Sequence, residues 1–530
     1  MDYLIRNSEI LDGSGTSSYR ANLAIQGDVI AYLGMEEPKA SEVIDAKGLM
    51  ITPGFIDIHT HEDTWLLYDP TAAEKLSQGV TTLIVGNCGF SAAPLLPGKE
   101  KLVREASPNF ADVPCDWASM SEYLKRLRQA NLGVNVGTFV GHNAVRLNVM
   151  GVEKRPPTAE ELGRMEALVR EAMEDGAFGL STGLIYVPGI YSETNEIIEL
   201  SKVAAEAAGI YCSHIRGEAS TLRKAVQEAL NIGREANISV EISHHKAVGR
   251  DNWGSVRETL NMIDEAHQEG VDVNCDVYPY AAGNTGLGTL IPSWVFSEGP
   301  AKTYERLTNH TTRAQITKEM MTKSVEEERP LVDTGPEHIM ISYCKDDPSL
   351  EGKTLAEVAR SNSSTPAEIV LDLVRKHGGT MHSILVILHE MSEDDVATVI
   401  RHPLSMIASD SVNPAGKPHP RVFGTCAKIL AEYVREKGIL SLEQAVKKMT
   451  SMPARKLGLS DRGVLKEGYK ADLAIFDPSK VRDKATFSNS NQLSEGMKLV
   501  FVNGKKAWED GRLTALRRGT VLFHAQPTTT

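Results

Sequence analysis

The chain has 530 residues, a formal net charge of −13 at pH 7 and 41% hydrophobic residues, which suits one large domain with a smaller one, or two to three average domains. It has no run of about 18 to 20 apolar residues, which a membrane-spanning helix needs, and no basic start followed by an apolar segment, so we expect a cytoplasmic protein with no membrane partner. The acidic balance and the lack of a Lys/Arg cluster argue against a nucleic-acid partner.

Both ends of the chain carry short β-strand patterns. Residues 3–5, 22–25 and 29–33 are β-prone runs separated by Gly or Asp turn signals. Residues 468–478 and 498–511 have the same character, and the Asn503-Gly504 pair is a strong hairpin signal. We therefore expect residues 1–52 and 460–530 to form one small β-sandwich domain.

The middle of the chain alternates short apolar strands with helical segments such as residues 158–176. The predicted strands are Phe55–His59, Thr81–Asn87, Val134–Gly141, Phe178–Gly183, Ile210–Ile215, Ser239–His244, Val271–Val277 and Leu404–Asp410. Eight such β/α steps favour an α/β fold of the TIM (β/α)8 barrel type over an open doubly wound sheet. We expect the barrel to occupy residues 53–459, with a helical insertion at about 286–340 between strands 7 and 8.

Five of these strands end in residues whose side chains can ligate a metal ion. His59 and His61 lie two residues apart, so they project to the same side of the first strand. The remaining ones are Cys88, His214, His244 and Asp410, at the ends of strands 2, 5, 6 and 8. A lone buried histidine is more often a hydrogen-bonded core residue, but this joint placement favours a ligand set. Imidazole, thiolate and carboxylate donors together match Zn²⁺ better than Mg²⁺ or Ca²⁺.

Cys88, in the stretch VGNCGFSAAP, has three common roles open to it: core residue, nucleophile or metal ligand. The six cysteines (88, 115, 212, 275, 344, 426) are too sparse for a disulfide framework, so we expect reduced thiols. A nucleophile would need a histidine base and a third residue that orients it. That role would leave the His59/His61 pair and Asp410 unexplained.

The motifs resemble those of the amidohydrolase superfamily. The resemblance rests on the PGFIDxHxH start, the histidines of strands 5 and 6, the aspartate of strand 8 and the terminal β layers. Within that superfamily, GNCGFS, GLSTGLIYVPG, ISHHK and the SDS…HPR block are similar to the D-aminoacylases, the N-acyl-D-amino-acid deacylases. The likeness covers nearly the whole chain. It implies a zinc-dependent hydrolase of linear amides that releases a carboxylate and a free D-amino acid.

The resemblance also implies roles for single residues. Cys88, His214 and His244 would bind one tight zinc ion, and Cys88 could bridge to a second, weaker position at His59 and His61. The strand-4 stretch at residues 177–186 has no lysine for the carbamylated bridge of related enzymes. Bound zinc lowers the pKa of water from about 15.7 toward 7. Asp410 would be the general acid and base, passing the proton to the leaving amine, and could also contact the metal.

Lys246 is the first candidate for binding the substrate carboxylate. It lies two residues after His244 and should face the same side, whereas His245 should face away. The resemblance implies that Tyr186, Lys246 and Arg421 together hold the carboxylate, and an arginine fork suits that task. Relatives specific for acidic D-amino acids are expected to carry an arginine in the loop at residues 276–292, which has no basic residue here. We therefore expect a neutral, apolar substrate side chain.

Three other functions fit parts of the pattern: a cyclic-amide hydrolase of the hydantoinase or dihydroorotase type, a peptidase that releases D-residues, and a non-catalytic scaffold with the same fold. The retained ligand set argues against the scaffold. The preference for D-substrates rests on the resemblance alone, and the sequence leaves the acyl group and the oligomeric state open. His389 has no role in the resemblance, and we expect it in the core or on the surface.

Overall fold

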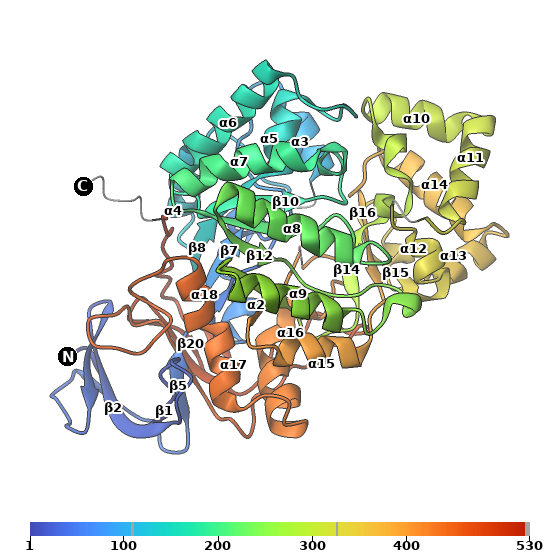
Figure 1. Ribbon diagram of the computed structural model, residues 1–530. Coiled ribbons are helices and arrows are strands. Elements are labelled where there is room, and N and C mark those ends of the chain that lie inside the picture. The colour runs from blue at the N-terminus through green and yellow to red at the C-terminus, as the bar shows by residue number, and fades with distance from the viewer. Residues whose placement is uncertain (108–110, 325–326, 413, 525–530) are drawn as a thin grey trace.

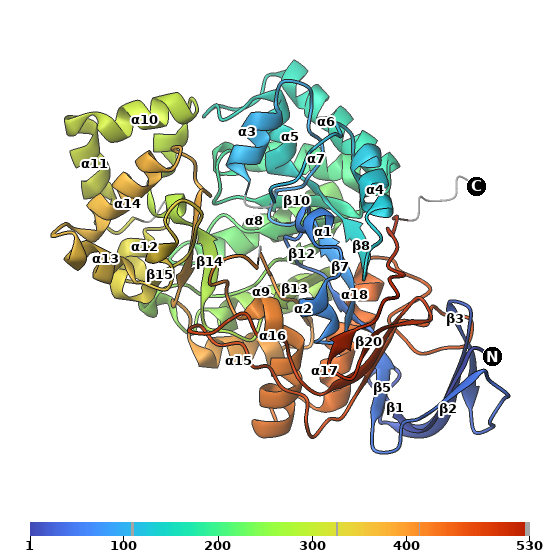
Figure 2. The same ribbon diagram turned by 180° about the vertical axis from the view of Figure 1, so that it is seen from behind.

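The structure is a computed structural model, and it describes residues 1–107, 111–324, 327–412 and 414–524. Figure 1 shows three regions: a β layer where the blue N-terminal and red C-terminal parts of the chain meet, a central α/β region, and a yellow region that projects to one side. Figure 2 shows the same three regions from behind. Every helix within the described ranges is too short or too polar to cross a membrane.

The terminal β layer is one nine-stranded sheet with strands from both ends of the chain. They are β1 (Tyr3–Ile10), β2 (Tyr19–Gln26), β3 (Val29–Gly34), β4 (Glu42–Asp45), β5 (Met50–Pro53), β18 (Leu473–Phe476), β19 (Met497–Val502), β20 (Lys505–Glu509) and β21 (Arg512–Leu513). Their order is β21-β20-β19-β18-β5-β1-β2-β3, and β4 pairs with β1. The antiparallel pairing of β18 with β5 joins the two ends of the chain, as the sequence predicted.

Strand β19 connects this sheet to the rest of the molecule through its alternating side chains. Leu499 and Phe501 pack in the core that belongs to the terminal sheet, whereas Val500 and Val502 pack in the main core. This follows from the period of two along a strand. The predicted hairpin is also confirmed, because Asn503-Gly504 joins β19 to β20 with positive φ at both residues.

Each predicted central strand coincides with strands of the structure. These are β6 (Phe55–Asp57), β7 (Val80–Val85), β8 (Asn135–Thr138) with β9 (Val140–Gly141), β10 (Gly179–Gly183), β11 (Ile210–His214), β12 (Ser239–Ile242), β13 (Val273–Val277) and β17 (Ser405–Ile407). They pair in parallel as β6-β7-β8 and as β9-β10-β11-β12-β13-β17. A parallel bridge between Thr60 and Ser411 links the segments that follow β6 and β17. The carboxyl ends of these strands therefore lie together.

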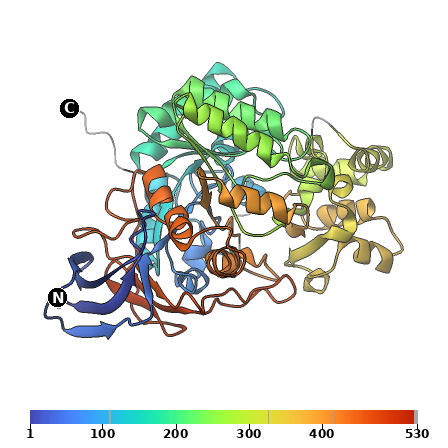
Figure 3. The same ribbon diagram turned by 60° about the horizontal axis from the view of Figure 1, so that its bottom comes forward.

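Helices lie on both sides of these strands, as Figure 3 shows. They are α1 (Trp65–Tyr68), α2 (Ala73–Leu76), α3 (Glu100–Ala106), α4 (Met120–Gln129), α5 (His142–Val149), α6 (Ala159–Glu174), α7 (Thr194–Glu206), α8 (Leu222–Ala236), α9 (Val256–Gln268), α15 (Glu393–Arg401), α16 (Arg421–Lys428), α17 (Leu442–Met449) and α18 (Ser451–Lys456). Helix α6 illustrates why they form. Thr158 and Glu161 make a capping box at its start, and Met165, Val169 and Met173 recur every four residues on its buried face.

The yellow region, which we call the lateral segment (residues 283–388), differs from the predicted helical insertion at 286–340. Its elements are β14 (Gly283–Gly286), α10 (Pro300–Thr308), α11 (His310–Met320), α12 (Pro330–Asp333), β15 (Ile339–Cys344), α13 (Leu355–Ser361), α14 (Pro366–Lys376) and β16 (Ile384–Leu388). The expected helices are present, but β14, β16 and β15 form an antiparallel sheet that the prediction missed. The apolar runs of β15 and β16 are too short for periodicity to separate a strand from a buried helix.

Candidate metal centre

Four of the predicted ligand residues converge at the carboxyl ends of the central strands. His59, Cys88, His244 and Asp410 are buried, and one donor atom from each lies within 4.8 Å of the others. The Sγ atom of Cys88 is 3.3 Å from Nε2 of His59 and 3.5 Å from Nε2 of His244. A second buried group, His214, Glu218 and His244, meets the same distance criterion and shares His244.

His61 lies beside this cluster and contacts it through Asp410. Its Nε2 atom is 3.1 Å from Oδ1 of Asp410, and Nε2 of His59 is 3.4 Å from the same oxygen. The rings of His59 and His61 are 5.3 Å apart, which agrees with the predicted projection to one side of the strand. The structure thus brings all six predicted ligand residues to one place.

Three of these residues have a left-handed backbone. The φ angle is +50° at Cys88, +36° at His244 and +48° at Asp410, and such a conformation costs about 1–3 kcal/mol for a residue with a side chain. The turn at Cys88 also needs Gly89, because a Cβ atom there would lie 2.8 Å from the backbone nitrogen of Gly183. Strained backbone therefore presents three of the six donor side chains.

Two buried carboxylates hold the histidines in place. Asp276 Oδ2 lies 3.1 Å from Nδ1 of His59, and its Oδ1 accepts a hydrogen bond from the backbone of His244. Glu218 Oε1 lies 3.1 Å from Nδ1 of His244. Such outer carboxylates fix the orientation of ligand imidazoles. We assigned neither from the sequence, although Asp276 is a polar residue in strand 7 and Glu218 lies four residues after His214.

The histidines that remain unpaired fit a metal ion. Neither ring nitrogen of His214 has a hydrogen-bond partner among the described residues, and the nearest Glu218 oxygen is 3.7 Å from Nε2. Nδ1 of His61 is also buried without such a partner. Leaving buried polar atoms unpaired is costly, and nitrogen and sulfur donors are those that zinc prefers. The donor chemistry and the unpaired atoms therefore both fit Zn²⁺.

The pKa values of Cys88 and Asp410 are shifted in opposite directions. Burial, together with the nearby Asp410 carboxylate, raises the pKa of the Cys88 thiol well above its usual value. Burial acts in the same direction on Asp410, but the Arg421 guanidinium and the histidines outweigh it and hold the pKa of that carboxyl well below its usual range. Asp410 is therefore ionised and able to accept a proton at neutral pH. Cys88 needs a cation to become a thiolate.

The geometry is also compatible with Cys88 acting as a nucleophile. Cys88, His59 and Asp276 follow one another at 3.3 Å and 3.1 Å, which matches the order of nucleophile, base and orienting carboxylate. The raised pKa of the thiol and the unpaired nitrogens of His214 favour a ligand role instead.

Residues 42–507 match the model of the amidohydrolase family. The chain belongs to this family. It is 36% identical over 526 residues to the D-aminoacylase of Alcaligenes xylosoxydans xylosoxydans, which covers 98% of this chain and 97% of that protein.

Two solved structures extend the comparison. One is a D-aminoacylase with a binuclear metal centre, described as activated by one metal and attenuated by the second. It has a TM-score of 0.83 at 34% identity and covers 98% of this chain and 99% of that one. The other is the N-acyl-D-glutamate deacylase of Bordetella bronchiseptica with zinc and a phosphonate that mimics the tetrahedral intermediate. It has a TM-score of 0.84 at 33% identity and covers 99% of this chain and 100% of that one. This amidohydrolase therefore has the fold of the D-aminoacylase structures.

A cavity of this amidohydrolase opens onto the cluster, and two of the three predicted carboxylate-binding residues line it. Tyr186 and Lys246 face the cavity. The Nζ atom of Lys246 is 2.6 Å from Glu218 Oε1 and 2.9 Å from His244 Nδ1, so it does face the same side as His244. His245 faces away and contacts Thr259.

Arg421 lies behind Asp410 and outside the cavity lining. It is 1% exposed, its Nη1 is 2.8 Å from Asp410 Oδ2, and its guanidinium lies 4.6 Å from the centre of the Tyr278 ring. Its Nε and Nη2 have no hydrogen-bond partner among the described residues. Two donors of the guanidinium therefore remain available.

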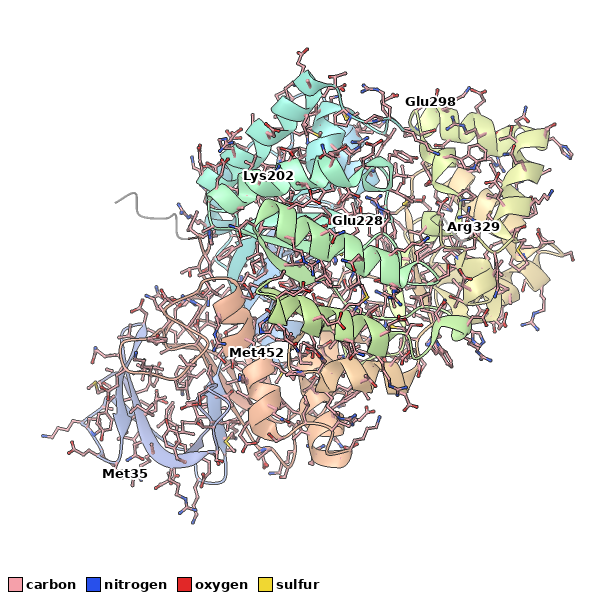
Figure 4. The ribbon with its side chains drawn as sticks, viewed as in Figure 1. Met35, Lys202, Glu228, Glu298, Arg329 and Met452 are labelled. Carbon is pink, nitrogen blue, oxygen red and sulfur yellow. The ribbon has the colours of Figure 1, made fainter. Side chains whose placement is uncertain are left out.

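The lateral segment supplies the cavity wall opposite the strand ends. The residues it contributes include Asn284, Thr285, Thr289, His382 and Leu385, and Glu390, which follows the segment in the chain, also lines the cavity. Burial raises the pKa of Glu390 to about 8 and that of Glu328 to about 7. Arg216, a cation of the lining, is paired with Glu228 of α8. Glu228 is labelled in Figure 4.

His389 is exposed and packs on Phe487, so it stands apart from the cluster.

Proposed function

We propose that this amidohydrolase hydrolyses the amide bond of N-acyl-D-amino acids to a carboxylate and a free D-amino acid. The observation that carries this proposal is the buried cluster of His59, Cys88, His244 and Asp410. His214 adjoins it through the second group, which shares His244, and both ring nitrogens of His214 lack a hydrogen-bond partner among the described residues. The full-length similarity to D-aminoacylase and to N-acyl-D-glutamate deacylase supports the substrate class. Cys88, His214 and His244 would hold one zinc ion tightly, and His59 and His61 would serve a weaker second position.

Zinc, when bound, supplies a Lewis acid and lowers the pKa of water. The chain's own residues move the protons. Asp410 Oδ1 is 3.1 Å from His61 Nε2, and its depressed pKa keeps it ionised and ready to accept a proton from the attacking water. Asp410 would then return that proton to the amide nitrogen, because an amide nitrogen does not leave as an anion. Such proton transfer contributes about 10² to 10⁴ to a rate.

Tyr186, Lys246 and Arg421 would bind the substrate carboxylate. Lys246 faces the cavity. Arg421 lies outside the cavity lining, next to Asp410, which lines it, and its unpaired Nε and Nη2 are donors for a substrate carboxylate that reaches past Asp410. Both cations are already close to carboxylates of the chain, Lys246 to Glu218 and Arg421 to Asp410. The substrate carboxylate would therefore share each of these cations with a carboxylate of the chain.

A neutral, apolar substrate side chain is the preference that the cavity supports. Glu328 and Glu390 lie among the cavity residues, and burial raises their pKa to about 7 and about 8. A second negative charge close by would be disfavoured wherever either of them is ionised. The loop at residues 276–292 adds no basic residue to offset them. Phe90, Ile185, Leu385 and Leu388 supply apolar surface in the same cavity.

Assays of N-acetyl-D-methionine, N-acetyl-D-leucine and their L-isomers, with hydantoin and a peptide ending in a D-residue alongside, test the function. We expect turnover of the D-isomers only. Hydantoin or peptide turnover without N-acyl cleavage would replace the proposal with one of the two enzymatic alternatives. Zinc that survives dialysis with no turnover of any of these substrates would favour the non-catalytic scaffold.

The same proposal extends to the architecture. The eight parallel strand positions and the bridge between Thr60 and Ser411 support one closed (β/α)8 barrel over residues 53–459. The continuous terminal sheet supports a small domain built from residues 1–52 and 460–530. Its sandwich form stays a prediction, because the strands are paired in a single sheet.

A further inference from the structure

A fully buried lysine contacts residues that neighbour His59, His61 and Asp410 in the chain, and the proposed mechanism does not use it. Lys75, on the short helix α2, is 0% exposed. Its Nζ atom is 3.0 Å from Asp57 Oδ2, 3.1 Å from Glu62 Oε1, 3.0 Å from Ser409 Oγ and 2.5 Å from Ser411 Oγ. One ammonium group therefore contacts four side chains from two distant parts of the chain.

These four partners bracket the proposed site residues. Asp57 and Glu62 enclose the segment that carries His59 and His61, and Ser409 and Ser411 flank Asp410. The two segments also contact each other directly. Ser409 donates to both carboxylate oxygens of Asp57, through its backbone nitrogen and its hydroxyl, and the Ser411 hydroxyl donates to Glu62. Lys75 is the cation at the centre of this network.

The backbone conformation of Asp410 needs stabilisation by its neighbours. Its φ of +48° is unfavourable for a residue with a side chain, so its neighbours must hold it there. Ser409 and Ser411 are the residues on either side, and both bond to Lys75. A displacement of about 1 Å in such a group can cost about 10² in rate.

We infer that Lys75 is a positioning residue that fixes Asp410 relative to the His59–His61 pair. The inference rests on the proposed function for its effect on rate. Its structural effect, an anchored turn at residues 409–411, is independent of which substrate the enzyme takes. Lys75 contacts neither substrate nor the proposed metal and acts only through its four partners.

Lys448, on helix α17, offers a matched control, because it contacts the start of strand β17. Lys448 is also a buried lysine, and its Nζ atom bonds to the Ser405 carbonyl and hydroxyl at the start of β17, whereas Ser409 and Ser411 follow the end of that strand. Lys75→Met and Lys448→Met therefore each remove one buried ammonium group, and the two groups contact residues at opposite ends of β17. Ser411→Ala removes one link of the Lys75 network without leaving a carboxylate without its cation, so it serves if Lys75→Met does not fold.

The experiment measures kcat and KM per folded, zinc-loaded molecule, together with amide hydrogen exchange of the peptide that covers residues 405–412. For Lys75→Met we expect a kcat about 100-fold lower, a KM within about threefold of wild type, and faster exchange at residues 409–411. Ser411→Ala should lower kcat about 10-fold, and Lys448→Met should keep kcat close to that of wild type. Wild-type kcat and exchange in Lys75→Met, or in Ser411→Ala if Lys75→Met does not fold, would overturn the inference. Equal losses in Lys75→Met and Lys448→Met would do so as well. If the wild type is inactive on every substrate, the proposed function fails, and hydrogen exchange alone decides the role of Lys75.

Discussion

The Nη1 atom of Arg421 lies 2.8 Å from Oδ2 of Asp410, and both side chains are buried. This pair joins a proposed substrate-binding residue to the proposed general base. Although burial raises the pKa of Asp410, Arg421 is the largest influence that lowers it. The two roles are therefore coupled, and changing Arg421 should alter both affinity and pH dependence.

Arg421→Met should raise KM about 10- to 100-fold, because a charge-assisted hydrogen bond to the substrate carboxylate is worth about 1.5–3 kcal/mol. It should also move the acid limb of the kcat profile to higher pH. Loss of the cation raises the pKa of Asp410, so its base form disappears at a higher pH as the solution is acidified. Arg421→Lys is the control, since it keeps the charge and should preserve the acid limb while KM still rises. An unchanged acid limb in Arg421→Met would refute the coupling.

Asp410→Asn should lower kcat by about 10² to 10⁴, because it removes the group that moves the proton. Asparagine tolerates the left-handed backbone at this position, so the fold should persist. Zinc content, measured by mass spectrometry of dialysed protein, should stay near that of wild type if Cys88, His214 and His244 form the tight site. Loss of zinc in this variant would instead make Asp410 a principal ligand.

Cys88→Ser should lose both zinc and activity, because a serine hydroxyl does not replace a thiolate donor. Cys275→Ala is the matched control, since Cys275 is a buried thiol of the core and should leave zinc content unchanged. Retained zinc with abolished turnover in Cys88→Ser would support the nucleophilic arrangement of Cys88, His59 and Asp276. Chelation of the wild type gives a second check, with activity expected to return on addition of zinc alone.

Discrimination against N-acetyl-D-glutamate relative to N-acetyl-D-methionine should strengthen as pH rises through about 8. The pKa of Glu390 is raised to about 8 by burial, so its carboxylate gains its negative charge only above that pH and then repels an acidic side chain. Glu390→Gln should remove this pH dependence. The ratio of kcat/KM for the two substrates at pH 7 and pH 9 is the measurement. A ratio that changes equally in wild type and Glu390→Gln would assign the effect to another group.

The strand-end donors could be predicted because strand periodicity and position alone bring them together. His59 and His61 share a face by period two, and Cys88 and Asp410 end strands that lie near each other in a parallel arrangement. Asp276, Glu218 and Lys75 were missed, because their roles depend on partners many residues away in the chain. The sheet of the lateral segment was missed for a different reason, namely that its strands are short apolar runs whose pairing only the tertiary structure decides.

The cavity is lined by two parts of the chain that differ in how they are distributed along the sequence. The proposed metal ligands come from strand ends scattered between residues 59 and 244, with Asp410 far beyond them, whereas the opposite wall comes from the lateral segment. One continuous stretch of chain therefore lines the cavity without contributing a donor atom to the metal centre. Such a separation would let substrate range diverge among relatives while the reaction itself is inherited unchanged.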